Sequence, residues 1–223
     1  MSDPESIKVV LLGESGVGKT SIISQFTTHK FDPHRETSLS AQFTSKTIDF
    51  PDLGQSIKFD IWDTVGQEKY RSLAKIFYKD AKVVIFVYDI TVESSLEQLK
   101  QYWYGETKDN SDGKPILAVV ANKIDLYANQ KVSNNDGKEF AEKIGAIFQT
   151  TSALSDSGIS TLFDNIGKTY LIPGYDYKAG DMKAQEEYMK KKKQESDEQK
   201  GKKNNERIKL NSQKTGSKKK CCL

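Results

Sequence analysis

Short apolar runs alternate with polar segments between residues 7 and 172 of this 223-residue chain. Some runs are apolar throughout, which is typical of parallel strands covered on both faces. In Ile57, Phe59 and Ile61, by contrast, every second position is apolar, as expected for a strand with one covered face. The pattern predicts six strands, at residues 7–12, 44–50, 57–62, 83–88, 115–121 and 146–149.

Helical periodicity fills the intervals between most of these strands. Leu96, Leu99 and Trp103 recur at three- and four-residue spacing, and so do apolar residues across 159–170. Two shorter helices are predicted at 19–26 and 139–144. Because strands alternate with helices, we expect an α/β fold with a six-stranded, mostly parallel sheet and helices on both faces.

The apolar pattern stops after Pro173-Gly174, where Lys, Glu, Gln and Ser become frequent. Such a segment buries too little apolar surface to fold alone. We therefore expect a flexible N-terminus at 1–6, one folded domain at 7–172 and a disordered tail at 173–223. The segment 178–223 holds 15 Lys and Arg residues against 7 Asp and Glu, so a basic tail follows an acidic domain. This asymmetry suggests a membrane surface or nucleic acid as the tail's partner.

Two classes of protein are not expected from this sequence. No apolar stretch approaches the roughly 18 residues of a membrane-spanning helix, and the first residues lack the apolar core of a signal peptide. Cys221 and Cys222 are the only cysteines, and they stand side by side near the end of the sequence. That placement argues against a disulfide framework, so we expect an intracellular protein.

The strongest chemical signal is Gly13–Thr20, which fits the pattern G-x-x-x-x-G-K-[ST]. It follows a predicted strand and opens a predicted helix, so its backbone N–H groups and the helix N-terminus can surround a phosphate. Lys19 would reach the β- and γ-phosphates of a nucleotide, and the Thr20 hydroxyl would ligate Mg²⁺. The predicted nucleotide-binding residues of this loop are Ser15, Gly16, Val17, Gly18, Lys19, Thr20 and Ser21.

A second motif, Asn122-Lys123-Ile124-Asp125, follows the predicted strand at 115–121. It therefore lies at the carboxyl edge of the sheet, where open α/β sheets bind ligands. The Asp125 carboxylate can accept hydrogen bonds from N1–H and the exocyclic amine of guanine, whereas adenine lacks this donor pair. Together the two motifs predict a site for GTP or GDP with Mg²⁺.

The segment 7–172, which contains both motifs, resembles the Rab family of small GTPases, in the Ras superfamily. Asp63–Glu68 resembles the second switch of that superfamily, usually D-T-A-G-Q-E, and Thr151–Ala153 resembles its T-S-A loop. The segments at 61–63, 69–73 and 87–91 are similar to Rab segments. The resemblance implies a P-loop NTPase fold and hydrolysis of GTP.

The resemblance also implies roles on the phosphate side of the nucleotide. Ser38 would ligate Mg²⁺ together with Thr20, and Asp63 would hold the ion through a water molecule. The Gly66 amide would bond the γ-phosphate, and Gln67 would orient the attacking water.

On the base side, Phe31 would pack against the guanine ring. The Ala153 amide, next to Ser152, would meet the guanine carbonyl. Further from the nucleotide, an aromatic triad falls where Rabs present such side chains to effector proteins: Phe43, Trp62 and Phe77.

Several positions depart from the usual family pattern. Ser38 replaces the first-switch threonine, keeping its hydroxyl and backbone N–H but losing the methyl group. Ser40 stands where Rabs usually have glycine, Val65 replaces an alanine, and Leu154 replaces a lysine beside the base. None of these changes removes a catalytic group. Ser38 and Val65 nevertheless keep open an alternative, a pseudo-GTPase scaffold that binds nucleotide but hardly hydrolyses it.

The chain ends in Lys218–Lys220, Cys221, Cys222 and Leu223. C-a-a-X prenylation requires a cysteine at the fourth position from the end, where Lys220 stands. The ending resembles instead the C-C-X signal for double geranylgeranylation of Rabs, so both cysteines are candidate lipidation sites. A solvated lysine run or a nuclear-import patch is the alternative.

These expectations combine into a GTP/GDP switch in vesicle trafficking. Its prenylated tail would attach it to the cytoplasmic face of an intracellular membrane, with a chaperone-bound pool in the cytosol. The implied partners are an exchange factor, a GTPase-activating protein, a GDP-dissociation inhibitor or escort protein, and effectors. We expect a monomeric domain and no nucleic-acid partner. A third alternative, an ATP-using P-loop enzyme, is disfavoured by Asn122–Asp125.

Overall fold

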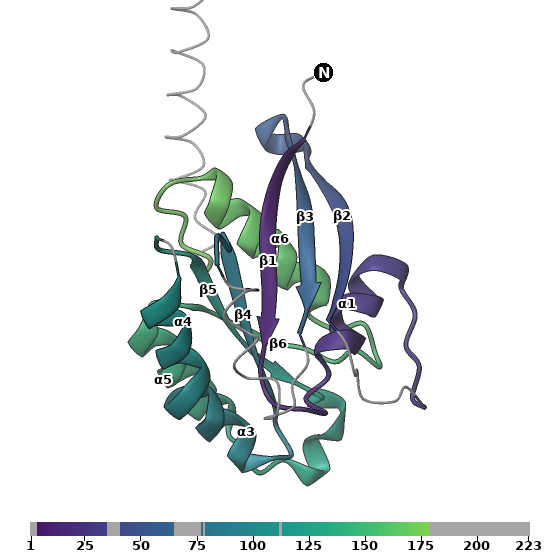
Figure 1. The fold of residues 1–223 in the computed structure, drawn as a ribbon. Helices are drawn as coiled ribbons and strands as arrows, with labels where there is room; N and C mark the ends of the chain where they lie inside the picture. Colours follow the sequence, from purple (N-terminus) through teal and green to yellow (C-terminus); the bar gives the residue numbers. More distant parts are fainter. Residues whose placement is uncertain (1–3, 35–40, 65–76, 78, 112, 179–223) are drawn as a thin grey trace, which may run out of the picture. The chain divides into compact units, whose positions relative to one another are not determined.

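The folded part of the chain is built on one mixed sheet. The computed structural model describes residues 4–34, 41–64, 77, 79–111 and 113–178. Six strands pair in the order β2-β3-β1-β4-β5-β6 (Figure 1). β2 is antiparallel to β3 and all the other pairs are parallel. The strands are β1 (Glu5–Leu12), β2 (Gln42–Phe50), β3 (Gln55–Asp63), β4 (Val83–Asp89), β5 (Ile116–Asn122) and β6 (Ile147–Thr150).

The strand pattern read from the sequence is confirmed, with ends that differ by a few residues. β4, the most uniformly apolar run, is buried at every position, as a central parallel strand should be. β3 alternates buried and half-buried residues. The hairpin between β2 and β3 turns through a short 3-10 helix, η1 (Pro51–Leu53), and Gly54 in the left-handed region. The predicted six-stranded, mostly parallel sheet is therefore correct.

Helices cover both faces of this sheet. On one face, the rings of Phe26 and Phe163 stack with their centroids 3.6 Å apart and meet Phe59 of β3 edge-on. On the other, Trp103 and Phe140 join the buried cluster that includes Tyr88. Figure 1 shows α3, α4 and α5 grouped together on this second side. The helices are α1 (Lys19–Thr28), α3 (Glu93–Gln98), α4 (Tyr104–Asn110), α5 (Asn134–Ile144) and α6 (Ile159–Leu171).

Two helical details differ from the sequence-based expectation. A π-helical segment, η3 (Leu99–Trp103), joins α3 to α4, and the apolar spacing did not indicate it. α5 begins at Asn134 rather than at 139. A capping box explains this earlier start, because the Ser133 side chain accepts from the Asp136 N–H and the Asp136 side chain accepts from the Ser133 N–H.

The chain divides into two units, Met1–Leu171 and Ile172–Leu223. Of the second unit the structure describes only 172–178, where the Tyr175 N–H donates to the Ile172 carbonyl at 3.1 Å. The predicted lipidation sites Cys221 and Cys222 lie outside the described residues. No helix in the described part of the chain is both long enough and apolar enough to cross a membrane.

The close packing of α5 on the sheet gives a test of the fold. A Cβ at Gly137 would lie 2.1 Å from the Tyr88 hydroxyl oxygen and 3.0 Å from Phe148 Cε2. Tyr88 is fully buried, so its ring has nowhere to move. We expect Gly137→Ala to lower the free energy of unfolding by about 1–3 kcal/mol, measured by urea denaturation at fixed nucleotide concentration.

The matched control is Gly105→Ala in α4, where a new Cβ would meet no atom within 4 Å. There the better helix propensity of alanine should raise stability by about 0.5–1 kcal/mol. Equal effects of the two substitutions would contradict the packing argument.

Candidate functional site

The Gly13–Thr20 loop connects β1 to α1 and requires two of its glycines for distinct reasons. Gly13 has φ 146°, and a Cβ there would lie 2.2 Å from the Val87 carbonyl oxygen. Gly18 has φ 97°, and its Cβ would lie 2.3 Å from Asn122 Nδ2. Both backbones therefore adopt conformations unfavourable to other residues and approach β4 or β5 too closely for a side chain. The loop is thus pressed against the carboxyl edge of the sheet.

Lys19 lies over this loop as a buried cation. Its side-chain ammonium donates to the carbonyls of Gly13 and Glu14, each at 2.9 Å, and the residue is 5% exposed. Burial lowers the pKa of Lys19 to about 8, and the charges of Asp63 and Glu14 offset part of this shift. A desolvated ammonium beside a loop of backbone N–H groups is a strong attractor for phosphate.

Thr20 and Asp63, two of the predicted Mg²⁺ ligands, meet although 43 residues separate them. The Thr20 hydroxyl donates to Asp63 Oδ2 at 2.5 Å. A hydroxyl and a carboxylate are the hard oxygen donors that Mg²⁺ prefers, so this pair fits the ion. The third predicted ligand, Ser38, lies outside the described residues, as do Gly66 and Gln67.

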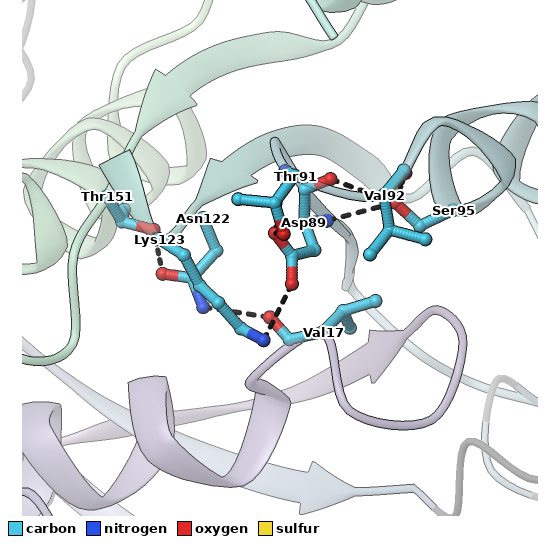
Figure 2. Close-up of polar contacts among 8 residues, drawn as sticks. All are labelled: Val17, Asp89, Thr91, Val92, Ser95, Asn122, Lys123 and Thr151. Atoms are coloured by element: carbon cyan, nitrogen blue, oxygen red, sulfur yellow. Dashed lines mark hydrogen bonds and ion pairs between the residues drawn. The ribbon is translucent and has the colours of Figure 1, made fainter. Parts of the chain in front are cut away.

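Asn122 links β5 and the loop after β6 to the phosphate loop (Figure 2). Its amide nitrogen donates to the Val17 carbonyl at 2.9 Å, and its amide oxygen accepts from the Thr151 hydroxyl at 3.0 Å. The side chain is buried, so these two bonds satisfy polar groups that water cannot reach. Val17, a predicted nucleotide-binding residue of this loop, has a buried side chain and contributes to the site through its carbonyl.

Lys123 is held by a partner that the sequence analysis did not single out. Its ammonium lies 2.6 Å from Asp89 Oδ2, and Asp89 is almost fully buried at the end of β4 (Figure 2). The other Asp89 oxygen accepts from the N–H and the hydroxyl of Thr91. Lys123 has φ 65°, an uncommon backbone conformation for lysine. The only signal for Asp89 was its place in the 87–91 segment, which showed resemblance but no role.

Asp125 is oriented from the loop after β6. The Ser152 hydroxyl donates to Asp125 Oδ1 at 2.5 Å, and the Ser152 oxygen accepts from the Ser155 N–H at 3.1 Å. The predicted base-reading carboxylate is thus held by Ser152, one of the two site residues predicted in the T-S-A loop. Ser152 reaches the site through Asp125 rather than by lining it.

These residues surround a cavity of about 430 Å³, a size that accommodates a ligand of several rings. Most of the predicted nucleotide-binding residues line it: Ser15, Gly16, Gly18, Lys19, Thr20, Ser21, Phe31, Asn122, Lys123, Asp125 and Ala153. Five further lining residues were not among the predicted ones: Asp32, Pro33, Thr64, Leu126 and Leu154. Leu154 was noted only as a departure from the family pattern.

The predicted aromatic triad is also brought together. The ring centroids of Phe43 and Trp62 are 5.2 Å apart, and those of Trp62 and Phe77 are 5.8 Å apart. Phe43 is 54% exposed, which is unusual for so large an apolar side chain. We call these three rings the aromatic surface: Phe43 on β2, Trp62 on β3, and Phe77.

Comparison with protein families matches residues 8–172 to the Ras family. Rab-21 from Geodia cydonium is 42% identical over 164 residues, which cover 74% of this chain and 70% of that protein. Human Rab-22A is 39% identical over 170 residues, 76% of this chain and 85% of that protein. Mouse Rab-31 is 40% identical over 162 residues, 73% of this chain and 82% of that protein. With a phosphate loop, a base pocket and these relatives, the chain belongs to the Ras family, as a GTP-hydrolysing small GTPase of the Rab type.

Proposed function

We propose that this chain is a trafficking switch whose bound guanine nucleotide sets the state of its aromatic surface. The observation that carries the proposal is the adjacency of Trp62 and Asp63 at the end of β3. Neighbouring residues of a strand face opposite sides. Asp63 contacts Thr20 at the phosphate loop, while Trp62 packs between Phe43 and Phe77. A shift at one face of this short segment is therefore transmitted to the other.

On the phosphate side, Lys19 binds the nucleotide and stabilises charge on its phosphates. Thr20, Asp63 and Ser38 hold Mg²⁺, which when bound neutralises phosphate charge. The Gly66 amide bonds the γ-phosphate and Gln67 positions the attacking water. Loss of the γ-phosphate then releases the Ser38 and Gln67 segments, which is the usual basis of such switches.

The coupling predicts a fluorescence signal. The chain has two tryptophans, Trp62 and Trp103. We expect exchange of GDP for a non-hydrolysable GTP analogue to change tryptophan emission, because the environment of Trp62 changes with the switch. Trp103→Phe should retain this change, which then comes from Trp62 alone. Trp103 Nε1 donates to Glu14 of the phosphate loop at 3.0 Å, so its own emission responds to nucleotide independently of Trp62. Unchanged emission of Trp103→Phe on exchange of GDP for the GTP analogue would contradict the proposed coupling.

On the base side, Asp125 reads guanine, Phe31 covers the ring and the Ala153 amide meets the guanine carbonyl. Lys123 shapes the floor of the pocket through its ion pair with Asp89. Asn122 does so through its hydrogen bonds with the Val17 carbonyl and the Thr151 hydroxyl. The hydrogen bond from Ser152 leaves the Asp125 carboxylate able to accept further bonds, because a carboxylate has about four lone-pair sites.

Base selection therefore depends on one carboxylate. Asp125→Asn replaces an acceptor by an amide donor, so guanine affinity should fall by at least about a hundredfold while affinity for xanthosine diphosphate rises. Equilibrium binding of fluorescent GDP and XDP measures both. Asp109→Asn, the same change at an exposed position of α4, should leave both affinities unchanged. Unaltered GDP binding by Asp125→Asn would exclude Asp125 as the base reader.

The proposed partners are an exchange factor, an activating protein, a GDP-dissociation inhibitor or escort protein and effectors that bind the aromatic surface. The proposed location is the cytoplasmic face of an intracellular membrane. Cys221 and Cys222 carry the prenyl chains, since stable anchoring needs two signals. Nearby lysines add about 1 kcal/mol each next to an anionic leaflet.

Removal of the thiols tests this anchoring. Cys221→Ser or Cys222→Ser alone should reduce the membrane-bound fraction in cell fractionation, and the double change should leave the protein in the supernatant with GDP binding intact. Neutralising Lys218–Lys220 should shift the distribution among membranes with only partial release. Membrane residence of the double-serine protein would show that a protein receptor, not lipid, holds it there.

A further inference from the structure

A contact between His29 and Asp156 joins two loops that are 127 residues apart in the sequence. His29 Nδ1 lies 3.3 Å from Asp156 Oδ2. His29 is the residue after α1, and Asp156 belongs to the loop between β6 and α6. We call this pair the His29–Asp156 clasp. The base pocket assigned above uses neither residue.

Both halves of the clasp stand on backbone in the left-handed region, with φ 53° at His29 and φ 56° at Asp156. Residues other than glycine rarely adopt this conformation, although His, Asn and Asp do so more often than most. Only two other non-glycine residues in the described part of the chain share it, Asp80 and Lys123. At His29 this conformation ends α1, as is common at helix C-termini, and at Asp156 it turns the loop before α6, so the backbone on both sides fixes where the two side chains begin.

Each side chain also has a fixed support. The His29 N–H donates to the Gln25 carbonyl at 3.0 Å, which closes the last turn of α1. The loop that carries Asp156 is closed by a pair of backbone hydrogen bonds between Ser152 and Ser157, at 3.0 and 3.1 Å. The clasp therefore joins two braced elements rather than two mobile ones.

The position of the clasp relates it to the base pocket. Phe31 lies two residues after His29 and lines one wall of the cavity. Ala153 and Leu154 lie just before Asp156 and line it from the other loop. The contact thus ties the wall that contains Phe31 to the wall that contains Ala153 and Leu154. Leu154 is 58% exposed and carries no charge of its own to make such a link.

We propose that the His29–Asp156 clasp holds these two walls together and slows the release of bound guanine nucleotide. The proposal rests on the function proposed for this pocket. His29 and Asp156 act as positioning residues, because they act on the base through Phe31, Ala153 and Leu154. Opening of the clasp separates the walls and frees the base edge first, while the phosphate side stays bound.

The size of the effect follows from exposure. The side chains of His29 and Asp156 are 61% and 37% exposed, so solvent screens their attraction. Exposed pairs of this kind change an equilibrium by a small factor, and we expect loss of the clasp to accelerate GDP release about two- to fivefold.

The experiment measures dissociation of fluorescent mant-GDP from the full-length chain, with excess GDP as the competitor. His29→Gly and Asp156→Gly each remove one side chain and suit the left-handed backbone, so both variants should fold. Asp80→Gly is the matched control, because Asp80 has φ 60°, is exposed and does not line the base pocket. We expect both clasp variants to release mant-GDP faster and the control to match the parent.

Coupling separates a contact from two independent loop effects. The double variant His29→Gly/Asp156→Gly should release nucleotide no faster than either single variant, since the contact is already lost. His29→Asp alone sets two carboxylates face to face and should release faster still. Adding Asp156→His reverses the pair and should restore a rate near that of the parent. Additive effects of the glycine variants, or no rescue by the reversed pair, would overturn the clasp.

Two further readouts locate the effect at the base. Chelation of Mg²⁺ by EDTA should accelerate release from every variant, yet the ratio between clasp variants and parent should persist. The single-turnover rate of GTP hydrolysis should remain at the parental value. A ratio that vanishes in EDTA would place the effect on the phosphate side and refute the proposal.

Failure of the parent itself to bind mant-GDP would instead overturn the assignment of the pocket. Tight parental binding with unchanged release from the variants would overturn the clasp alone.

Discussion

The site depends on the buried amide of Asn122, which bonds the Val17 carbonyl on one side and the Thr151 hydroxyl on the other. These two hydrogen bonds hold the ends of β5 and β6 against the phosphate loop. Parallel pairing makes this geometry available, because it brings the carboxyl ends of the five parallel strands to one edge. Gly18 must lack a side chain, because a Cβ there would lie 2.3 Å from the amide nitrogen of Asn122. Loop, base motif and sheet edge are thus one packed unit.

Around this unit, the side chains predicted to bind the ligand form hydrogen bonds with one another or with their own loop. Lys19 donates to carbonyls of its own loop, Thr20 donates to Asp63, and Ser152 donates to Asp125. Buried polar groups without partners would destabilise the fold, so these bonds keep the site intact. In the function that we propose, nucleotide binding exchanges some of these partners for phosphate, metal and base. Because β3 carries both Asp63 and Trp62, the switch that we propose has to cross only one residue to pass from the phosphate side to the aromatic surface.

The features that the sequence predicted are those encoded locally. The phosphate loop and Asn122–Asp125 are contiguous motifs, and each strand shows its burial in its own periodicity. The early start of α5 is also encoded locally, by the capping box of Ser133 and Asp136 rather than by apolar spacing. By contrast, the Lys123–Asp89 ion pair and the His29–Asp156 contact join residues that are far apart in the sequence. Single-residue patterns carry no information on such pairs, because a charged side chain in a loop is equally compatible with solvent.

The π-helical segment between α3 and α4 shows a different limit of sequence reasoning. Leu96, Leu99 and Trp103 fit ordinary helical spacing, yet Leu99–Trp103 adopts the wider turn. Such segments are rare and often mark functional positions. Here the segment ends at Trp103, which is fully buried and donates to the Glu14 carboxylate beside the phosphate loop. The indole N–H needs a partner when buried, and the wider turn accompanies the contact that supplies one. The wider turn thus ends at a tertiary contact with the nucleotide site, which no local pattern records.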